Sequence, residues 1–268
     1  MAKKKTQKLI TPLIDNEITD KNYYDDHMYI SNSTLKLFMD NPPRKFQHLI
    51  SNPPKPSSAM KFGTAFHMLA LEGMDTFLKH YAVEPDGVDK RTTLGKATWE
   101  KFLEQSQGKE HLSHKDYKII STMEMNLRES QHSLLLSNCD EFEKIYLWKN
   151  NKHGILCKGK LDAVNTKKKY IVDLKTTRSA EPVAFMETII NQKYLMQAAF
   201  YCDALGYKDY YIYAIEKSKP YCVGVYKVSE QSLSTGRELY NMALRKYKEY
   251  VDSGEFPMDY NNNLIFNI

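Results

Sequence analysis

The segment GILCKGKLDAVNTKKKYIVDLKTTR, which runs from Gly154 to Arg178, is the basis of the fold prediction. Two runs rich in β-forming residues, Ile155–Val164 and Tyr170–Leu174, flank a polar connection that ends in consecutive lysines. This pattern predicts a β-hairpin with a charged, solvated turn. The two strands of this hairpin should form part of a larger sheet, because an isolated hairpin is only marginally stable in water.

Charged side chains lie near the open end of the predicted hairpin. Asp162 closes the first strand, and Asp173 and Lys175 follow on the second. Because side chains alternate along a strand, Asp173 and Lys175 project to one face while Val172 and Leu174 project to the other. Two carboxylates and an ammonium group beside a sheet edge suit Mg²⁺, which needs only one or two carboxylates besides water and phosphate oxygens. The alternative is an ordinary salt bridge, because Asp-x-Lys alone is a weak motif.

The whole chain has the composition of a globular protein. Of its 268 residues, 42% are apolar and 26% are charged, which favours one large domain, predicted over residues 27–268. Residues 1–26 are predicted to be a flexible basic tail. The net charge of +5 permits a nucleic-acid partner but does not require one.

Cysteine spacing and hydropathy exclude several classes of protein. The cysteines have no C-x-x-C spacing, which argues against a zinc site or an iron–sulfur cluster and favours reduced thiols; they are Cys139, Cys157, Cys202 and Cys222. No run approaches the ~20 apolar residues that a membrane span needs. We therefore expect a cytoplasmic protein without a membrane partner.

The order of the remaining patterns predicts an α/β fold, a sheet with helices on both faces. Residues 83–96 are polar and are expected to form an exposed loop. The predicted helices cover Met60–Glu72, Ala97–Gln105, Lys115–Leu136, Ala180–Leu205 and Ser229–Val251, and the further strands cover Lys144–Trp148, Tyr210–Ile215 and Tyr221–Val228.

Several motifs together resemble one nuclease superfamily. The sequence Gly159-Lys160-Leu161-Asp162 is followed by Asp173-Leu174-Lys175, then by Gln197-Ala198-Ala199-Phe200-Tyr201 on a predicted helix; Gly63-Thr64-Ala65-Phe66-His67 lies upstream. This set resembles the PD-(D/E)xK nucleases, in particular the RecB-like branch marked by Gln-x-x-x-Tyr, and within it the RecE-type phage and prophage exonucleases similar to exodeoxyribonuclease VIII. The resemblance implies a restriction-endonuclease-like central mixed β-sheet flanked by helices, with a helical N-terminal region.

The resemblance also implies roles for individual residues. Asp162 and Asp173 would bind Mg²⁺, with Mn²⁺ as a substitute, and His67 would join them as a metal ligand. Lys175 would position the attacking water. The superfamily's Pro-Asp appears here as Leu161-Asp162. Because the aspartate supplies the ligand and the proline only shapes the backbone, we expect activity to be retained.

Four residues have plainer alternatives. The resemblance favours Gln197 and Tyr201 as catalytic residues that orient Lys175 or contact DNA phosphate; the alternative is the edge of an amphipathic helix. A single histidine on a helix, such as His67, is more often a hydrogen-bonded structural residue than a ligand. Glu143 could add a carboxylate, but it also fits a plain exposed face beside Glu141, so we leave it out of the predicted site.

The resemblance implies a Mg²⁺-dependent 5′-to-3′ exodeoxyribonuclease that degrades one strand of linear double-stranded DNA. The remaining 3′ single-stranded tails would serve recombination with a RecT-like annealing protein. The enzyme would be a homo-oligomer such as a tetrameric ring, encoded by a phage or prophage and acting in the bacterial cytoplasm. The alternatives are an endonuclease of the same fold and a catalytically inactive DNA-binding module. Retention of Asp162, Asp173 and Lys175 argues against the inactive module.

Overall fold

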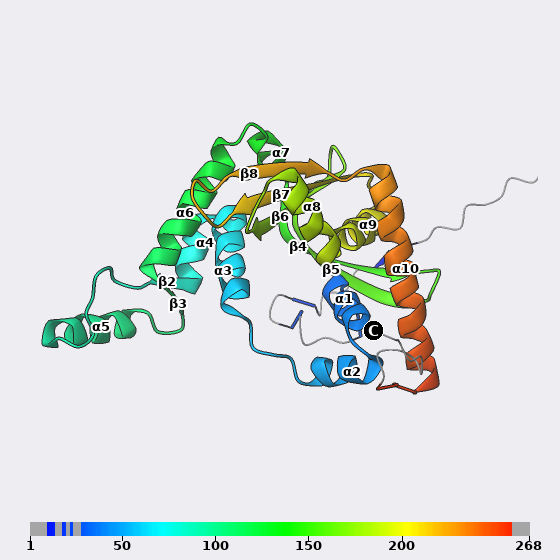
Figure 1. Cartoon of the computed structure of the whole chain (residues 1–268), viewed down its shortest axis with the longest axis horizontal. Coiled ribbons are helices and arrows are strands. Elements are labelled where there is room, and N and C mark those ends of the chain that lie inside the picture. The colour runs from blue at the N-terminus through cyan, green and yellow to red at the C-terminus, as the bar shows by residue number, and fades with distance from the viewer. Residues whose placement is uncertain (1–9, 14–17, 20–21, 24–27, 259–268) are drawn as a thin grey trace, which may run out of the picture.

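A six-stranded mixed sheet forms the centre of the protein, in the order β1-β4-β5-β6-β7-β8 (Figure 1). The structure is a computed structural model that describes residues 10–13, 18–19, 22–23 and 28–258. The strands are β1 (Ile10–Leu13), β4 (Glu141–Asn150), β5 (Ile155–Asn165), β6 (Tyr170–Thr177), β7 (Asp209–Glu216) and β8 (Val223–Lys227). Neighbouring strands are antiparallel except β6 and β7, which are parallel. The predicted α/β fold with a mixed sheet is confirmed.

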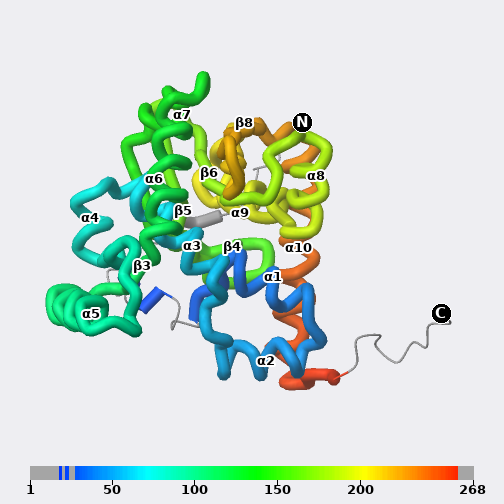
Figure 2. Tube along the Cα trace, turned by 60° about the vertical axis from the view of Figure 1, so that its left-hand side comes forward, coloured from blue at the N-terminus to red at the C-terminus, as the bar shows by residue number. Residues whose placement is uncertain are grey.

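Helices cover both faces of this sheet (Figures 1 and 2). One face packs against α1 (Asn32–Asp40), α8 (Pro182–Asn191), α9 (Tyr194–Leu205) and α10 (Glu230–Ser253). The other packs against α3 (Ser58–His67), the π-helix η1 (Met68–Glu72), α4 (Gly73–His80) and α6 (His114–Glu129). Adjacent residues of β6 point into different cores, Ile171 into the first and Val172 into the second. Both faces of β6 are therefore buried.

The remaining elements lie around this three-layer body. They are α2 (Pro43–Ser51), α5 (Thr93–Gln105), α7 (Ser133–Ser137) and a small parallel sheet of β2 (Tyr81–Val83) and β3 (Glu110–Leu112). Helix α5 projects away from the body in both views (Figures 1 and 2).

The predicted hairpin forms, and its two strands separate where the charged residues lie. Pairing of β5 with β6 covers only Ala163–Asn165 and Tyr170–Val172. Beyond this ladder, β5 remains paired with β4, and β6 remains paired with β7 as far as Thr177. The sheet therefore opens between β5 and β6 immediately after the hairpin.

Two predicted helices are interrupted. The one expected over Ala180–Leu205 is divided into α8 and α9 at Lys193, whose left-handed backbone has a φ of 55°. The one expected over Lys115–Leu136 ends at Glu129, and α7 follows. The predicted loop over residues 83–96 contains the last residue of β2 and the first turn of α5. Neither of the two helix breaks is marked in the sequence by proline or glycine, which are the strongest local signals of a break.

The predicted tail is only partly within the described residues. Its residues Ile10–Leu13 form β1 and pair with β4, which the polar composition of this segment did not indicate. Most of the rest of 1–26 lies outside the described residues, so the proposed domain boundary stays a prediction. Among the helices that the structure describes, none is both long and apolar enough to cross a membrane.

Helix α10 can approach α9 closely because residue 236 is glycine. A Cβ atom at Gly236 would lie 2.0 Å from the backbone oxygen of Leu195. We therefore expect Gly236→Ala to lower the free energy of unfolding by about 2 kcal/mol or more, because a backbone atom cannot move aside as a side chain can. Thermal unfolding checks this, with Ser234→Ala on the exposed side of α10 as control. Equal stability of the two variants would contradict the packing described.

Candidate active site

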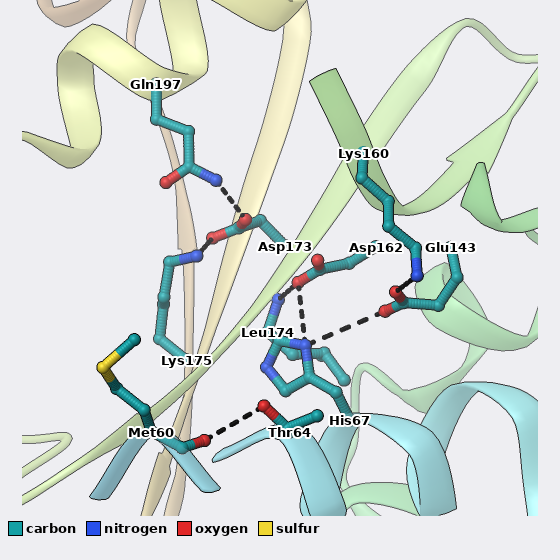
Figure 3. A network of polar contacts seen from close by, with 10 residues as sticks. All are labelled: Met60, Thr64, His67, Glu143, Lys160, Asp162, Asp173, Leu174, Lys175 and Gln197. Atoms are coloured by element: carbon teal, nitrogen blue, oxygen red, sulfur yellow. Dashed lines mark hydrogen bonds and ion pairs between the residues drawn. The ribbon is translucent and has the colours of Figure 1, made fainter. Parts of the chain in front are cut away.

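Polar and charged side chains from both helical layers and three strands meet where β5 and β6 separate (Figure 3). Helix α3 approaches from one side of the opening and α9 from the other. The residues are His67 at the end of α3, Glu143 on β4, Lys160 and Asp162 on β5, Asp173 and Lys175 on β6, and Gln197 on α9.

Asp162 is fixed by the backbone of the neighbouring strand. Its Oδ2 accepts a hydrogen bond of 2.7 Å from the backbone N–H of Leu174, so the carboxylate takes the place of a strand partner where the ladder has ended. The same oxygen lies 3.7 Å from Nδ1 of His67. The end of α3 thus presents its imidazole to the carboxylate across the opening (Figure 3).

Glu143 is the residue of β4 that faces Asp162. The pairs on either side, Phe142 with Ala163 and Lys144 with Leu161, place these two carboxylates opposite each other. Glu143 has a left-handed backbone with a φ of 48°, which is uncommon for a residue other than glycine. Such strain persists only where surrounding structure holds it, often at functional sites.

Three side chains of this group can hold a divalent cation. One ligand atom each from His67, Glu143 and Asp162 lies within 4.8 Å of the others. Oε1 of Glu143 is 3.9 Å from Nδ1 of His67, and its Oε2 is 2.9 Å from Nζ of Lys160. Two carboxylates and an imidazole from three separate elements provide the nitrogen and oxygen donors that divalent cations such as Mn²⁺ accept, and carboxylates suit Mg²⁺. The donor set therefore fits a divalent metal.

Asp173 lies beside this cluster and is held by two partners. Its Oδ2 is 2.7 Å from Nζ of Lys175, and its Oδ1 accepts a hydrogen bond of 2.7 Å from Nε2 of Gln197. The carboxylate is almost completely buried, with 3% of the residue exposed. Nζ of Lys175 also lies 5.1 Å from the ring centre of Tyr194, at the start of α9. Gln197 thus contacts Asp173, and its predicted role of orienting Lys175 or contacting DNA phosphate stays a prediction.

The structure therefore brings together most of the predicted site. His67, Asp162, Asp173, Lys175 and Gln197 all lie at the opening (Figure 3). The metal-binding roles of the two aspartates and His67 remain predictions.

Tyr201 lies one turn further along α9, buried with its ring against β5, where a Cβ atom at Gly159 would be 2.6 Å from its Cε1. That contact gives Tyr201 a packing role beside the strand that carries Asp162. A catalytic role for Tyr201 also remains a prediction.

Glu143 is the site residue that the sequence reasoning set aside. The turn at residues 151–154 pairs Asn150 with Ile155, and counting the same number of residues along each strand from this pair places residue 143 opposite residue 162. The sequence therefore contains a signal for Glu143. Using it requires the register of β4 on β5, which the alternation of Glu141, Phe142 and Glu143 does not determine.

Burial shifts the protonation of these groups. It raises the pKa of Asp162 and of Glu143, and raises that of Asp173 to about 6 although Lys175 opposes the shift. Burial and then Lys175 lower the pKa of His67, so its imidazole is neutral and available as a ligand at neutral pH. Without a cation, ionised carboxylates at this position therefore disfavour the folded state.

Neutralising Asp162 should stabilise the metal-free protein. A carboxyl whose pKa is raised on folding binds its proton more tightly in the folded state, so stability falls as the pH rises from the ordinary value of 3.8 through the folded pKa. We expect Asp162→Asn to raise the melting temperature in EDTA at pH 7.5 by about 2–5 °C, and by less at pH 4.5. The control is Asp252→Asn, on the exposed end of α10. A lower melting temperature for Asp162→Asn than for this control would contradict the expectation.

Comparisons with known proteins find a matching family model and matching solved structures. Residues 31–262 match the model of a family described as a PDDEXK-like domain of unknown function (DUF3799). The crystal structure of a candidate exonuclease from Eubacterium rectale has a TM-score of 0.63 at 15% identity, covering 94% of this chain and 96% of that one. A phage-related exonuclease from Haemophilus somnus 129PT is 10% identical, covering 87% of this chain and 100% of that one, with a TM-score of 0.37. No curated protein matches the chain. The predicted resemblance to PD-(D/E)xK nucleases is confirmed.

Proposed function

The chain belongs to the family of PDDEXK-like domains, and from that premise we propose that it is a divalent-metal-dependent exodeoxyribonuclease that hydrolyses phosphodiester bonds at the ends of linear duplex DNA. The observation that supports this most is the meeting of His67, Glu143 and Asp162 beside the buried pair of Asp173 and Lys175. A second support for this proposal is that the Eubacterium rectale protein, with which the chain shares its fold, is described as a candidate exonuclease.

The cation expected in this site is Mg²⁺, with Mn²⁺ as a substitute, held by His67, Glu143 and Asp162, with Asp173 beside them as the further ligand that the sequence predicts. When bound, it would supply Lewis-acid stabilisation of phosphoryl charge and lower the pKa of a coordinated water. The protein's own contribution is to hold three ligands from separate elements in a partly buried opening. The strands β5 and β6, which flank this opening, are held in place by their pairing with β4 and β7.

Lys175 acts as a cation in this proposal. Burial alone would lower the pKa of its ammonium group, but Asp173 and then Asp162 outweigh burial and raise the pKa above its ordinary value. Lys175 therefore stays protonated at neutral pH, donates hydrogen bonds and stabilises negative charge that develops on the phosphoryl group. It does not serve as the base that deprotonates water. Asp173, oriented by Gln197, holds the ammonium in place.

The finer features of the activity rest on the motif resemblance. We propose digestion from the 5′ end, which leaves 3′ single-stranded tails for a RecT-like annealing protein in recombination. We also propose a ring-shaped homo-oligomer, encoded by a phage or prophage and acting in the cytoplasm. The Gln-x-x-x-Tyr helix and the Gly-Thr-x-x-His segment support these features, because they resemble the marks of the RecB-like branch, within which the chain is most similar to the RecE-type exonucleases.

Digestion of matched linear and circular DNA tests the proposal. With Mg²⁺, we expect the protein to degrade a linear duplex and leave a covalently closed circle of the same sequence intact, and we expect neither to be cut in EDTA. A label at the 5′ end should be released before a label at the 3′ end of the same strand. Cleavage of the circle would favour the endonuclease, and binding of DNA without any hydrolysis would favour the inactive module.

A further inference from the structure

The break between α8 and α9 gathers lysine side chains beside the active site. Residues 192–194 are consecutive, and each takes part. Oε1 of Gln192 accepts a hydrogen bond of 2.5 Å from Nζ of Lys36 on α1, and Lys193 forms an ion pair with Asp40, also on α1. The ring of Tyr194 lies near the ammonium of Lys175. One short segment thus connects α1 to the catalytic lysine.

The three ammonium groups around this segment have different partners. Lys175 is paired with Asp173, and Lys193 is paired with Asp40. Lys36 is half-buried, its hydrogen-bond partner is a neutral amide, and no carboxylate of a described residue lies within 4.0 Å of its ammonium. Lys36 is therefore the ammonium group of the three that forms no ion pair within 4.0 Å in the part of the chain that the structure describes.

Burial and the neighbouring charges shift the pKa of Lys36. Burial lowers the pKa of its ammonium group, Asp40 opposes the shift, and Lys193 and Lys175 lower the pKa further. Lys193 and Lys175 therefore both repel the ammonium group of Lys36, and Asp40 attracts it. An anion bound at Lys36 would offset the repulsion by the two lysines.

The backbone of Lys193 points to a functional reason for the break. Its φ of 55° is left-handed, a conformation that is strained for a residue with a Cβ atom. A glycine or asparagine would adopt this conformation more readily. The strained lysine both ends α8 and directs its side chain to α1.

We propose that Lys36 and Lys193 form a phosphate-binding site, the lysine ledge, that holds the DNA strand next to the bond being cut. The inference rests on the proposed function, because its ligand is the substrate of that reaction. Ammonium groups bind phosphate oxygens as point charges, and such contacts position a strand without reading its sequence. On binding, Lys36 would exchange the amide oxygen of Gln192 for a phosphate oxygen. The phosphate is either an internal phosphodiester or a terminal monoester.

Affinity for short duplexes tests the lysine ledge. Wild type, Lys36→Ala, Lys193→Ala and Lys36→Arg are compared by fluorescence anisotropy with Ca²⁺ in place of Mg²⁺, over a range of salt concentrations. Lys208→Ala, an exposed lysine before β7, is the control that removes the same charge. We expect each alanine variant to bind about threefold to tenfold more weakly and to lower the slope of log Kd against log salt by about 1, while Lys36→Arg binds nearly as wild type does.

The ends of the duplex identify the phosphate. A defect seen only with 5′-phosphorylated duplexes would assign the ledge to the terminal monoester, and an equal defect with 5′-hydroxyl duplexes would assign it to an internal phosphodiester. Affinity and salt slope equal to those of Lys208→Ala would overturn the inference. Hydrolysis by wild type, measured in parallel with Mg²⁺, separates the two claims, since a wild-type protein that neither binds nor cuts DNA overturns the proposed function itself.

Discussion

Replacing Lys175 with alanine should lower the rate of hydrolysis of linear duplex DNA by about 10³-fold while leaving divalent-metal binding in place. The reason is that Lys175 supplies a buried, protonated ammonium beside the metal-binding cluster, and the described ligands of that cluster do not include it. Initial rates at saturating Mg²⁺ measure the effect. Calorimetric titration with Mn²⁺ checks that the cation still binds.

The matched control for this variant is Lys167→Ala, in the exposed turn of the same hairpin. It removes the same charge far from any described site residue and should retain wild-type rates. Because Lys175→Ala leaves Asp173 buried without its cation, the melting temperature must be measured alongside. A folded Lys175→Ala protein that is as active as Lys167→Ala would refute the role given to this lysine.

Glu143→Gln should weaken divalent-metal binding by about 10- to 100-fold or more and lower hydrolysis accordingly. The substitution keeps the size of the side chain but removes the charge of one of the three candidate ligands. The sequence offers a close control, because Glu141 lies two residues earlier on the same strand and belongs to no described metal cluster. Titration with Mn²⁺ in parallel with activity compares the two variants. Equal affinities for Glu143→Gln and Glu141→Gln would remove Glu143 from the site.

The hairpin residues of the site could be predicted because their placement depends on local rules. Side-chain alternation puts Asp173 and Lys175 on one face whatever the rest of the chain does. A tight hairpin likewise brings the end of its first strand beside the second, so Asp162 and Asp173 are neighbours. The predicted helix that carries His67 also formed, because its apolar spacing is strong.

Glu143 and the break at Lys193 could not be predicted in the same way, since both depend on tertiary structure. Glu143 reaches the cluster through the register of β4 and through a left-handed backbone that no local signal marks. Lys193 interrupts a segment whose residues all favour or tolerate a helix, and its ion pair with Asp40 joins segments that are 153 residues apart. Contacts of this kind override local propensity, and the site is completed by them.

Anomalous diffraction from crystals soaked in Mn²⁺ tests whether the opening between β5 and β6 is a divalent-metal centre. We expect a peak of anomalous density within bonding distance of His67, Glu143 and Asp162, on the side of the cluster that faces Lys175. A peak bound to other residues, or no peak at Mn²⁺ concentrations that support hydrolysis, would contradict it.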